Sequence, residues 1–116
     1  MDEELASIVG KRAADIYEYA ISAANDCIVC TTYFKNLLDS EGIDIHHFEF
    51  TKDEELLVEF ARALANDPRH IPADLKDRMQ ARYNDREFVV ITSMGIMMLA
   101  NNYFNDIMEV EPGQRL

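Results

Sequence analysis

Glycine and proline are scarce in this chain of 116 residues, with four and three copies, and alternating β-branched residues are nearly missing. Both absences disfavour a β-sheet protein. No apolar run reaches the roughly eighteen residues of a membrane-spanning helix, and the acidic start lacks the basic residues of a secretory signal. We therefore predict a helical cytoplasmic protein without a membrane segment.

Basic residues are also few, because 11 lysines and arginines stand against 22 aspartates and glutamates, for a net charge of -11. The largest basic cluster is the pair Lys11 and Arg12, whereas binding to nucleic acid or anionic lipid needs a basic stripe or patch. Neither partner class is expected. Hydrophobic residues make up 48% of the chain, which is typical of a globular protein, and its length suits a single domain over residues 1–116.

Apolar residues recur at helical spacing, so the predicted fold is all-α, with five helices or with six if Gly10 interrupts the first. The expected helices span residues 3–24, 27–40, 51–67, 72–83 and 84–109. Two of them begin with the spacing of a capping box, Thr51 with Glu54 and Asn84 with Glu87.

The last predicted helix is apolar on nearly every side. Between Phe88 and Ala100 only Thr92, Ser93 and Gly95 interrupt the apolar residues. Such a helix needs cover on several sides, so we predict a homo-oligomer in which a second subunit supplies part of that cover. The alternative is a central helix wrapped entirely by its own neighbours.

Cys27 and Cys30 stand three residues apart at the start of the second predicted helix. That spacing puts both thiols on one face, close enough for a disulfide, and the positive end of the helix dipole favours the thiolate. Two alternatives are that both cysteines are small buried apolar residues, or that they bind zinc with His46 or His47. Zinc is disfavoured because a long helix separates the two pairs. We expect no metal and no cofactor; the spacing permits a redox pair, and burial of both cysteines as small apolar residues is the open alternative to it.

Residues 15–30, DIYEYAISAANDCIVC, place an acidic residue twelve positions before the first cysteine of the CxxC, after a stretch of small residues. Residues 51–68 and 101–106 add a matching second helical block. Over about residues 11–109 the chain resembles the carboxymuconolactone decarboxylase family, and specifically its AhpD-like alkylhydroperoxidase branch. The resemblance implies an all-helical subunit that assembles into trimers or hexamers.

In the AhpD-like branch the CxxC cysteines cycle between dithiol and disulfide while they reduce hydroperoxides, with no metal or flavin in the site. Carried over by position, Cys27 and Cys30 are the redox pair, and Asp15 takes the place of the family's acidic relay residue. The histidine through which that relay works is missing. Phe34 stands where the pattern has it, four residues after the second cysteine, and Val29 stands where some members have another histidine.

A hairpin that turns near Asp26 would place Asp15 more than one helical turn beyond Cys30, so that another group must serve as the base. The nearest side chains by this count are Glu18, Tyr19, Ser22 and Tyr33. The carboxylate and the two phenols among them are the candidate substitutes. The competing interpretation is that Tyr33 and Phe34 belong to the core. In it, Asp15 and Glu18 face solvent.

The expected function is a thiol-dependent alkylhydroperoxidase or disulfide reductase in antioxidant defence, with a hydroperoxide or a protein disulfide as substrate and a thiol reductant protein as partner. One alternative is a redox-responsive homo-oligomer without turnover. A second is decarboxylation of a lactone acid. It is disfavoured because the decarboxylase branch does not rely on a CxxC, and because the sequence reveals no cationic pocket for an anionic substrate.

Overall fold

The computed structural model describes residues 2–25, 28–44 and 49–110. In these ranges the chain forms helices and no strand, which confirms the predicted all-α class. The six helices are α1 (Asp2–Val9), α2 (Lys11–Ala24), α3 (Ile28–Ser40), α4 (Lys52–Asn66), α5 (Ala73–Arg82) and α6 (Asp85–Ile107).

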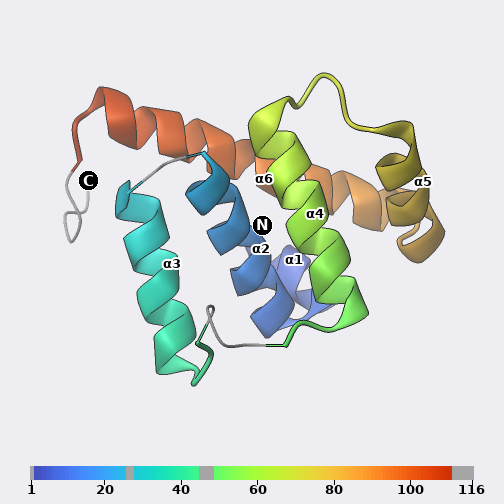
Figure 1. Cartoon of the computed structure of the whole chain (residues 1–116), viewed down its shortest axis with the longest axis horizontal. Coiled ribbons are helices and arrows are strands. Elements are labelled where there is room, and N and C mark those ends of the chain that lie inside the picture. The colour runs from blue at the N-terminus through green and yellow to red at the C-terminus, as the bar shows by residue number, and fades with distance from the viewer. Residues whose placement is uncertain (1, 26–27, 45–48, 111–116) are drawn as a thin grey trace.

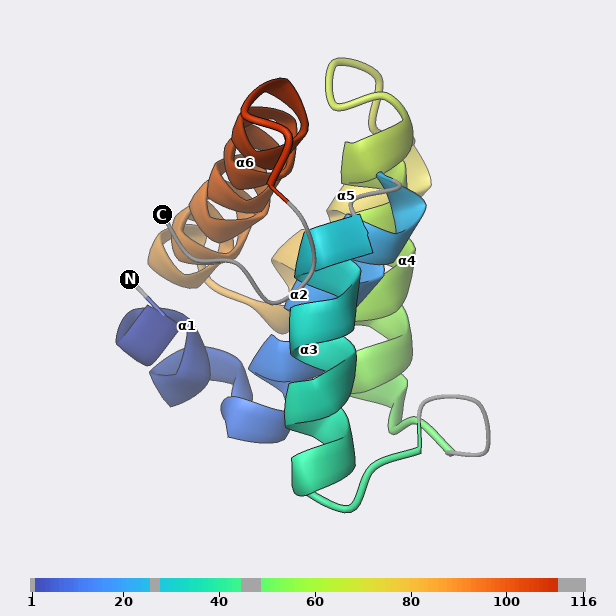
Figure 2. The same cartoon turned by 90° about the vertical axis from the view of Figure 1, so that its left-hand side faces the viewer.

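Helix α2 is the centre of the molecule, because it packs against α1, α3, α4 and α6. Figure 1 shows α2 between α3 and α4, with the long α6 crossing above them and α5 beside the first half of α6. In the perpendicular view of Figure 2, α3 faces the viewer, α1 and α6 lie on one side of α2, and α4 lies on the other. In the described part of the chain, the start of α3, which carries Cys30, therefore follows shortly after the end of the central helix.

Gly10 separates the first two helices, so the six-helix version of the prediction is confirmed. Its φ angle of 92° lies in the region that favours glycine, because a side chain there would collide with the backbone. The chain turns at this point, and α2 begins at Lys11 with a new direction (Figure 2).

Both predicted capping boxes are present. The side chain of Thr51 accepts a hydrogen bond from the backbone N–H of Glu54, whose carboxylate accepts one from the backbone N–H of Thr51. Asn84 and Glu87 make the same reciprocal pair at the start of α6. These local bonds satisfy amides that have no partner inside the helix, which is why sequence spacing alone located the two starts.

Most of the predicted core is buried, including Tyr17, Phe60 and Met79, each at most 1% exposed. Ala24, the last residue of α2, was expected in the core but is exposed. A larger correction concerns the polar face of α2. Asp15 and Glu18 are only 8% and 5% exposed, so the interpretation that they face solvent is wrong.

Helix α6 contacts α1, α2, α4 and α5, yet these four neighbours do not cover it. Val89, Ile96 and Ile107 are 62%, 45% and 78% exposed. The alternative in which α6 is wrapped entirely by its own chain is therefore wrong, and part of its apolar surface is uncovered in the single chain. No helix in the described ranges has both the length and the apolar character needed to cross a membrane.

Candidate functional site

Only one cysteine of the predicted redox pair lies within the described residues. Cys30 is in the first turn of α3, whereas Cys27 lies outside the described residues. The side chains of Cys30, Tyr33 and Phe34 lie outside them as well. The site is therefore described by the groups of α2 and α6 that surround this end of the hairpin.

An ion pair at the open end of the hairpin sets its register. The ammonium group of Lys11, in the first turn of α2, bonds to the carboxylate of Glu41, which directly follows α3. These two residues stand equally far before and after Asp26 in the sequence. The contact agrees with the register expected for a turn near Asp26, in which Ser22 and Cys30 are at the same level.

Asp15 lies toward the open end of the hairpin. Its carboxylate bonds to Lys11 at 2.9 Å, and Lys11 also holds Glu41. In the register above, Asp15 and Cys30 differ in level by seven residues, or about 10 Å of helical rise. Burial raises the pKa of Asp15 above its usual value. The hydrogen bond from Lys11 acts to lower this pKa, and the nearby Glu41 acts to raise it.

Glu18 is the second buried carboxylate of α2, and in the register above it is nearer than Asp15 to the level of Cys30. It lies almost one turn closer to the hairpin turn than Asp15, and its side chain belongs to the core rather than to the solvated surface. Its charge also contributes to the raised pKa of the buried Tyr17, although desolvation is the larger cause. Tyr19, the other α2 candidate, is half-buried against the core.

A buried polar pair lies between the ends of α2 and α6, and it joins Ser22 to Asn102, which the sequence analysis did not single out. Ser22 and Asn102 are both fully buried, and the Ser22 hydroxyl lies 3.4 Å from Oδ1 of Asn102. The available signal was the spacing of Asn102, which continues the buried face formed by Ile91, Met94 and Met98. An asparagine on the buried face of an apolar helix needs a polar partner.

Two amide groups near this end of the hairpin lack acceptors. Nδ2 of Asn102 and Nδ2 of Asn25 are buried and make no hydrogen bond within the described part of the chain. Asn25 directly follows α2, and Asn102 contacts the last part of the same helix through Ser22. A buried donor without an acceptor costs about 1–3 kcal/mol. Such donors can stabilise a negatively charged sulfur or oxygen beside them.

The described residues contain no cluster of three or more histidine, cysteine, aspartate or glutamate side chains that could hold a metal. His46, His47 and Cys27 lie outside these residues, and so does the zinc site that the sequence analysis considered as an alternative. His70 is exposed, and its ring Nδ1 lies 2.8 Å from the carboxylate of Asp67.

Comparison of the chain with protein families, with curated proteins and with solved structures found no match. The resemblance to the AhpD-like branch therefore rests on the residues quoted above, and the chain is assigned to no family.

Proposed function

We propose that the protein is a thiol-disulfide oxidoreductase that reduces hydroperoxides or protein disulfides with Cys27 and Cys30. The observation that carries this proposal is the position of Cys30 in the first turn of α3, three residues after the other cysteine of the chain. Free amides and the helix dipole at such a position lower the pKa of a thiol and increase its nucleophilic form.

The proposed reaction has two steps on the protein. A cysteine thiolate attacks one peroxide oxygen, so that an S–O bond forms, the O–O bond breaks, and the leaving alkoxide takes a proton to become an alcohol. The second thiol then attacks the sulfenic sulfur, which forms the disulfide and releases water. A dithiol reductant supplies two electrons and two protons to reopen the disulfide.

Glu18 is the favoured proton carrier because it is buried and lies nearer than Asp15 to the level of Cys30 in the hairpin register. Tyr33 remains a candidate by its position in α3. The free amides of Asn102 and Asn25 would stabilise the negative charge that develops on sulfur and on the leaving oxygen. Asp15 is assigned the supporting role of holding Lys11.

The test is the consumption of cumene hydroperoxide by the purified protein with excess dithiothreitol. We expect turnover by the wild type and its loss in both Cys27→Ser and Cys30→Ser. Replacing either cysteine removes the disulfide, whereas Ser40→Ala at the exposed end of α3 is a control that should keep full activity. Full activity in either cysteine variant would contradict the proposal.

The roles of the two carboxylates are separated by a second pair of variants. Glu18→Gln should lower the rate of peroxide consumption at least tenfold near neutral pH, since general acid-base catalysis contributes about 10²–10⁴-fold. Asp15→Asn should retain most of that rate. A larger loss of rate in Asp15→Asn than in Glu18→Gln would make Asp15 the proton carrier and would refute the assignment of Glu18.

A second candidate function is a redox-responsive homo-oligomer, and the exposed apolar residues of α6 favour it. These residues are Val89, Ile96, Met97, Tyr103, Phe104 and Ile107, together with Met108 directly after the helix. Exposed apolar patches of this kind are typical of protein interfaces. Light scattering of reduced and oxidised samples distinguishes the two functions. A change in oligomeric mass without peroxide turnover would support the second candidate.

A further inference from the structure

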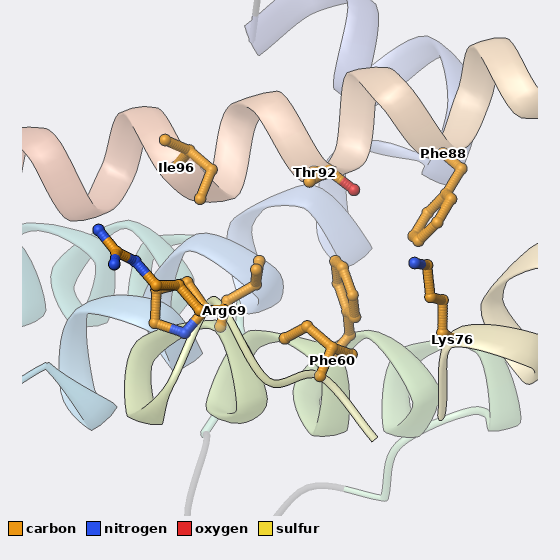
Figure 3. A pocket seen from close by; sticks show the side chains of 9 residues that line it. Phe60, Arg69, Lys76, Phe88, Thr92 and Ile96 are labelled. Carbon is orange, nitrogen blue, oxygen red and sulfur yellow. The ribbon is translucent and has the colours of Figure 1, made fainter. Parts of the chain in front are cut away.

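A pocket of about 300 Å³ lies between α4, the α4–α5 connection and α6, away from the CxxC hairpin. Phe60 and Leu64 of α4 line one side, and Phe88 and Ile96 of α6 line the other. Figure 3 shows the two phenylalanine rings and the aliphatic chains turned toward the space between the helices. A volume of this size is at the lower end of sites for small molecules, which are mostly apolar with a few polar groups.

Two cationic residues line this apolar pocket. Arg69 and Lys76 lie at its opposite ends, and the ammonium group of Lys76 points toward the ring of Phe88 (Figure 3). Thr92 also lines the pocket, and its hydroxyl is directed toward the end that holds Lys76 and Phe88. One end of the pocket therefore combines a positive charge with a hydroxyl group.

Most of the cationic side chains in the described ranges are paired with carboxylates. Six lysine and arginine residues in the described ranges form ion pairs with carboxylates: Lys11, Arg12, Lys35, Arg78, Arg82 and Arg86. Within the same ranges, only Lys52, Arg62, Arg69 and Lys76 have no such partner. Two of these four line the same apolar pocket, although acidic residues outnumber basic ones 22 to 11.

The nearest carboxylate in the connection is engaged elsewhere. Asp67 accepts hydrogen bonds from the backbone N–H of Arg69 at 3.3 Å and lies 2.8 Å from the ring of His70. It thereby fixes the turn that carries Pro68 and Arg69 to the pocket, while the Arg69 guanidinium stays unpaired within the described chain. The connection is ordered by its own contacts, so this wall of the pocket exists before a ligand arrives.

We propose that this pocket binds an amphipathic carboxylate, such as a medium-chain fatty acid. The carboxylate lies beside Lys76 and accepts a hydrogen bond from Thr92, and the hydrocarbon tail covers Phe60 and Leu64 and extends toward Ile96. Charge complementarity selects the anion, because the pocket offers an unpaired ammonium group. The apolar lining selects the tail. The proposed binding does not involve Cys27 or Cys30, so its test does not depend on the proposed redox function.

The test is a titration of the reduced full-length protein with octanoate. Calorimetry and the amide chemical shifts monitor the binding. We expect saturable binding of one octanoate per chain with a Kd of about 1 mM or lower. The amides of Phe88 and Thr92 should shift, and 1-octanol should bind at least tenfold more weakly because it lacks the charge.

Matched variants locate the charge effect. Lys76→Gln should raise the Kd for octanoate about tenfold, and Thr92→Val should raise it about threefold. Lys52→Gln and Arg62→Gln remove the same charge from the two unpaired cations outside the pocket, and they should leave the Kd within about twofold. The double Cys27→Ser, Cys30→Ser variant should bind octanoate like the wild type.

Three results would overturn the proposal. The first is the absence of saturable binding. The second is equal affinity for octanoate and 1-octanol, or equal weakening by Lys76→Gln and Lys52→Gln, since the pocket charge would then play no part. The third is a set of chemical-shift changes confined to the exposed apolar face of α6, around Val89 and Ile107, which would place the ligand on that face.

Discussion

The hydroxyl of Tyr17 donates a 2.8 Å hydrogen bond to the backbone carbonyl of Ile91 and so joins the central helix α2 to α6. The contact requires a glycine one turn further along α6. A Cβ atom on Gly95 would lie 2.5 Å from both the Tyr17 hydroxyl and Cδ1 of Leu64. Gly95 therefore allows α2 and α4 to approach α6 closely, because any other residue would occupy the space of these two side chains.

Gly95→Ala should lower the free energy of unfolding by about 2 kcal/mol, since the new methyl group forces two buried side chains to move. Helix propensity alone would change stability in the opposite direction, by about 1 kcal/mol in favour of alanine. Urea denaturation measures the difference. Combining the change with Tyr17→Phe, which removes the clashing hydroxyl, should give a smaller loss than the sum of the two single losses. Exact additivity would contradict the close contact.

Glu54→Ala should destabilise the protein more than Glu87→Ala, although both remove the acidic member of a capping box. Glu54 is 4% exposed and also accepts two 2.8 Å bonds from Arg12 of α2. We expect a loss of about 1 kcal/mol for Glu87→Ala and about 2 kcal/mol for Glu54→Ala, because the latter also breaks an ion pair whose carboxylate is buried, although its Arg12 partner is exposed. Equal losses by urea denaturation would show that the ion pair adds nothing.

The stability contributed by Asp15 should fall as the pH rises. Its folded pKa lies above its unfolded value, chiefly because burial disfavours the charged carboxylate. The folded state therefore binds the proton more tightly, and this contribution is present below the unfolded pKa and lost as the pH rises through the folded one. Relative to wild type, Asp15→Asn should be more stable near pH 7 than near pH 4, as measured by urea denaturation. The opposite trend would contradict the raised pKa.

Asn102→Leu should leave the free energy of unfolding within about 1 kcal/mol of wild type, or raise it. The change removes a fully buried Nδ2 that has no acceptor in the described chain, which favours folding. It also removes the Oδ1 acceptor that lies 3.4 Å from the buried Ser22 hydroxyl, and the two effects offset each other. Peroxide consumption should nevertheless slow, because a donor near the proposed thiol site is gone. A loss of several kcal/mol with unchanged turnover would assign Asn102 a structural role only.

Local signals in the sequence were sufficient to predict the helices. Gly10, the two capping boxes and the apolar periodicity act within one or two turns of the chain, and the structure confirms the helix starts that they indicated. The hairpin register could also be anticipated from its turn near Asp26, because two antiparallel helices joined by a short connection must pair residues at similar distances from it.

The tertiary structure decided which polar side chains are buried and which groups they contact. The sequence places Asp15 and Glu18 on a polar face of α2, but this helix packs against α1, α3, α4 and α6, and both carboxylates are buried in the folded chain. The pocket lined by Lys76 and Thr92 arises in the same way, since α4, α5 and α6 meet there from distant parts of the chain. Periodicity within a segment determines which residues share a face, whereas only the packing of segments determines what that face meets.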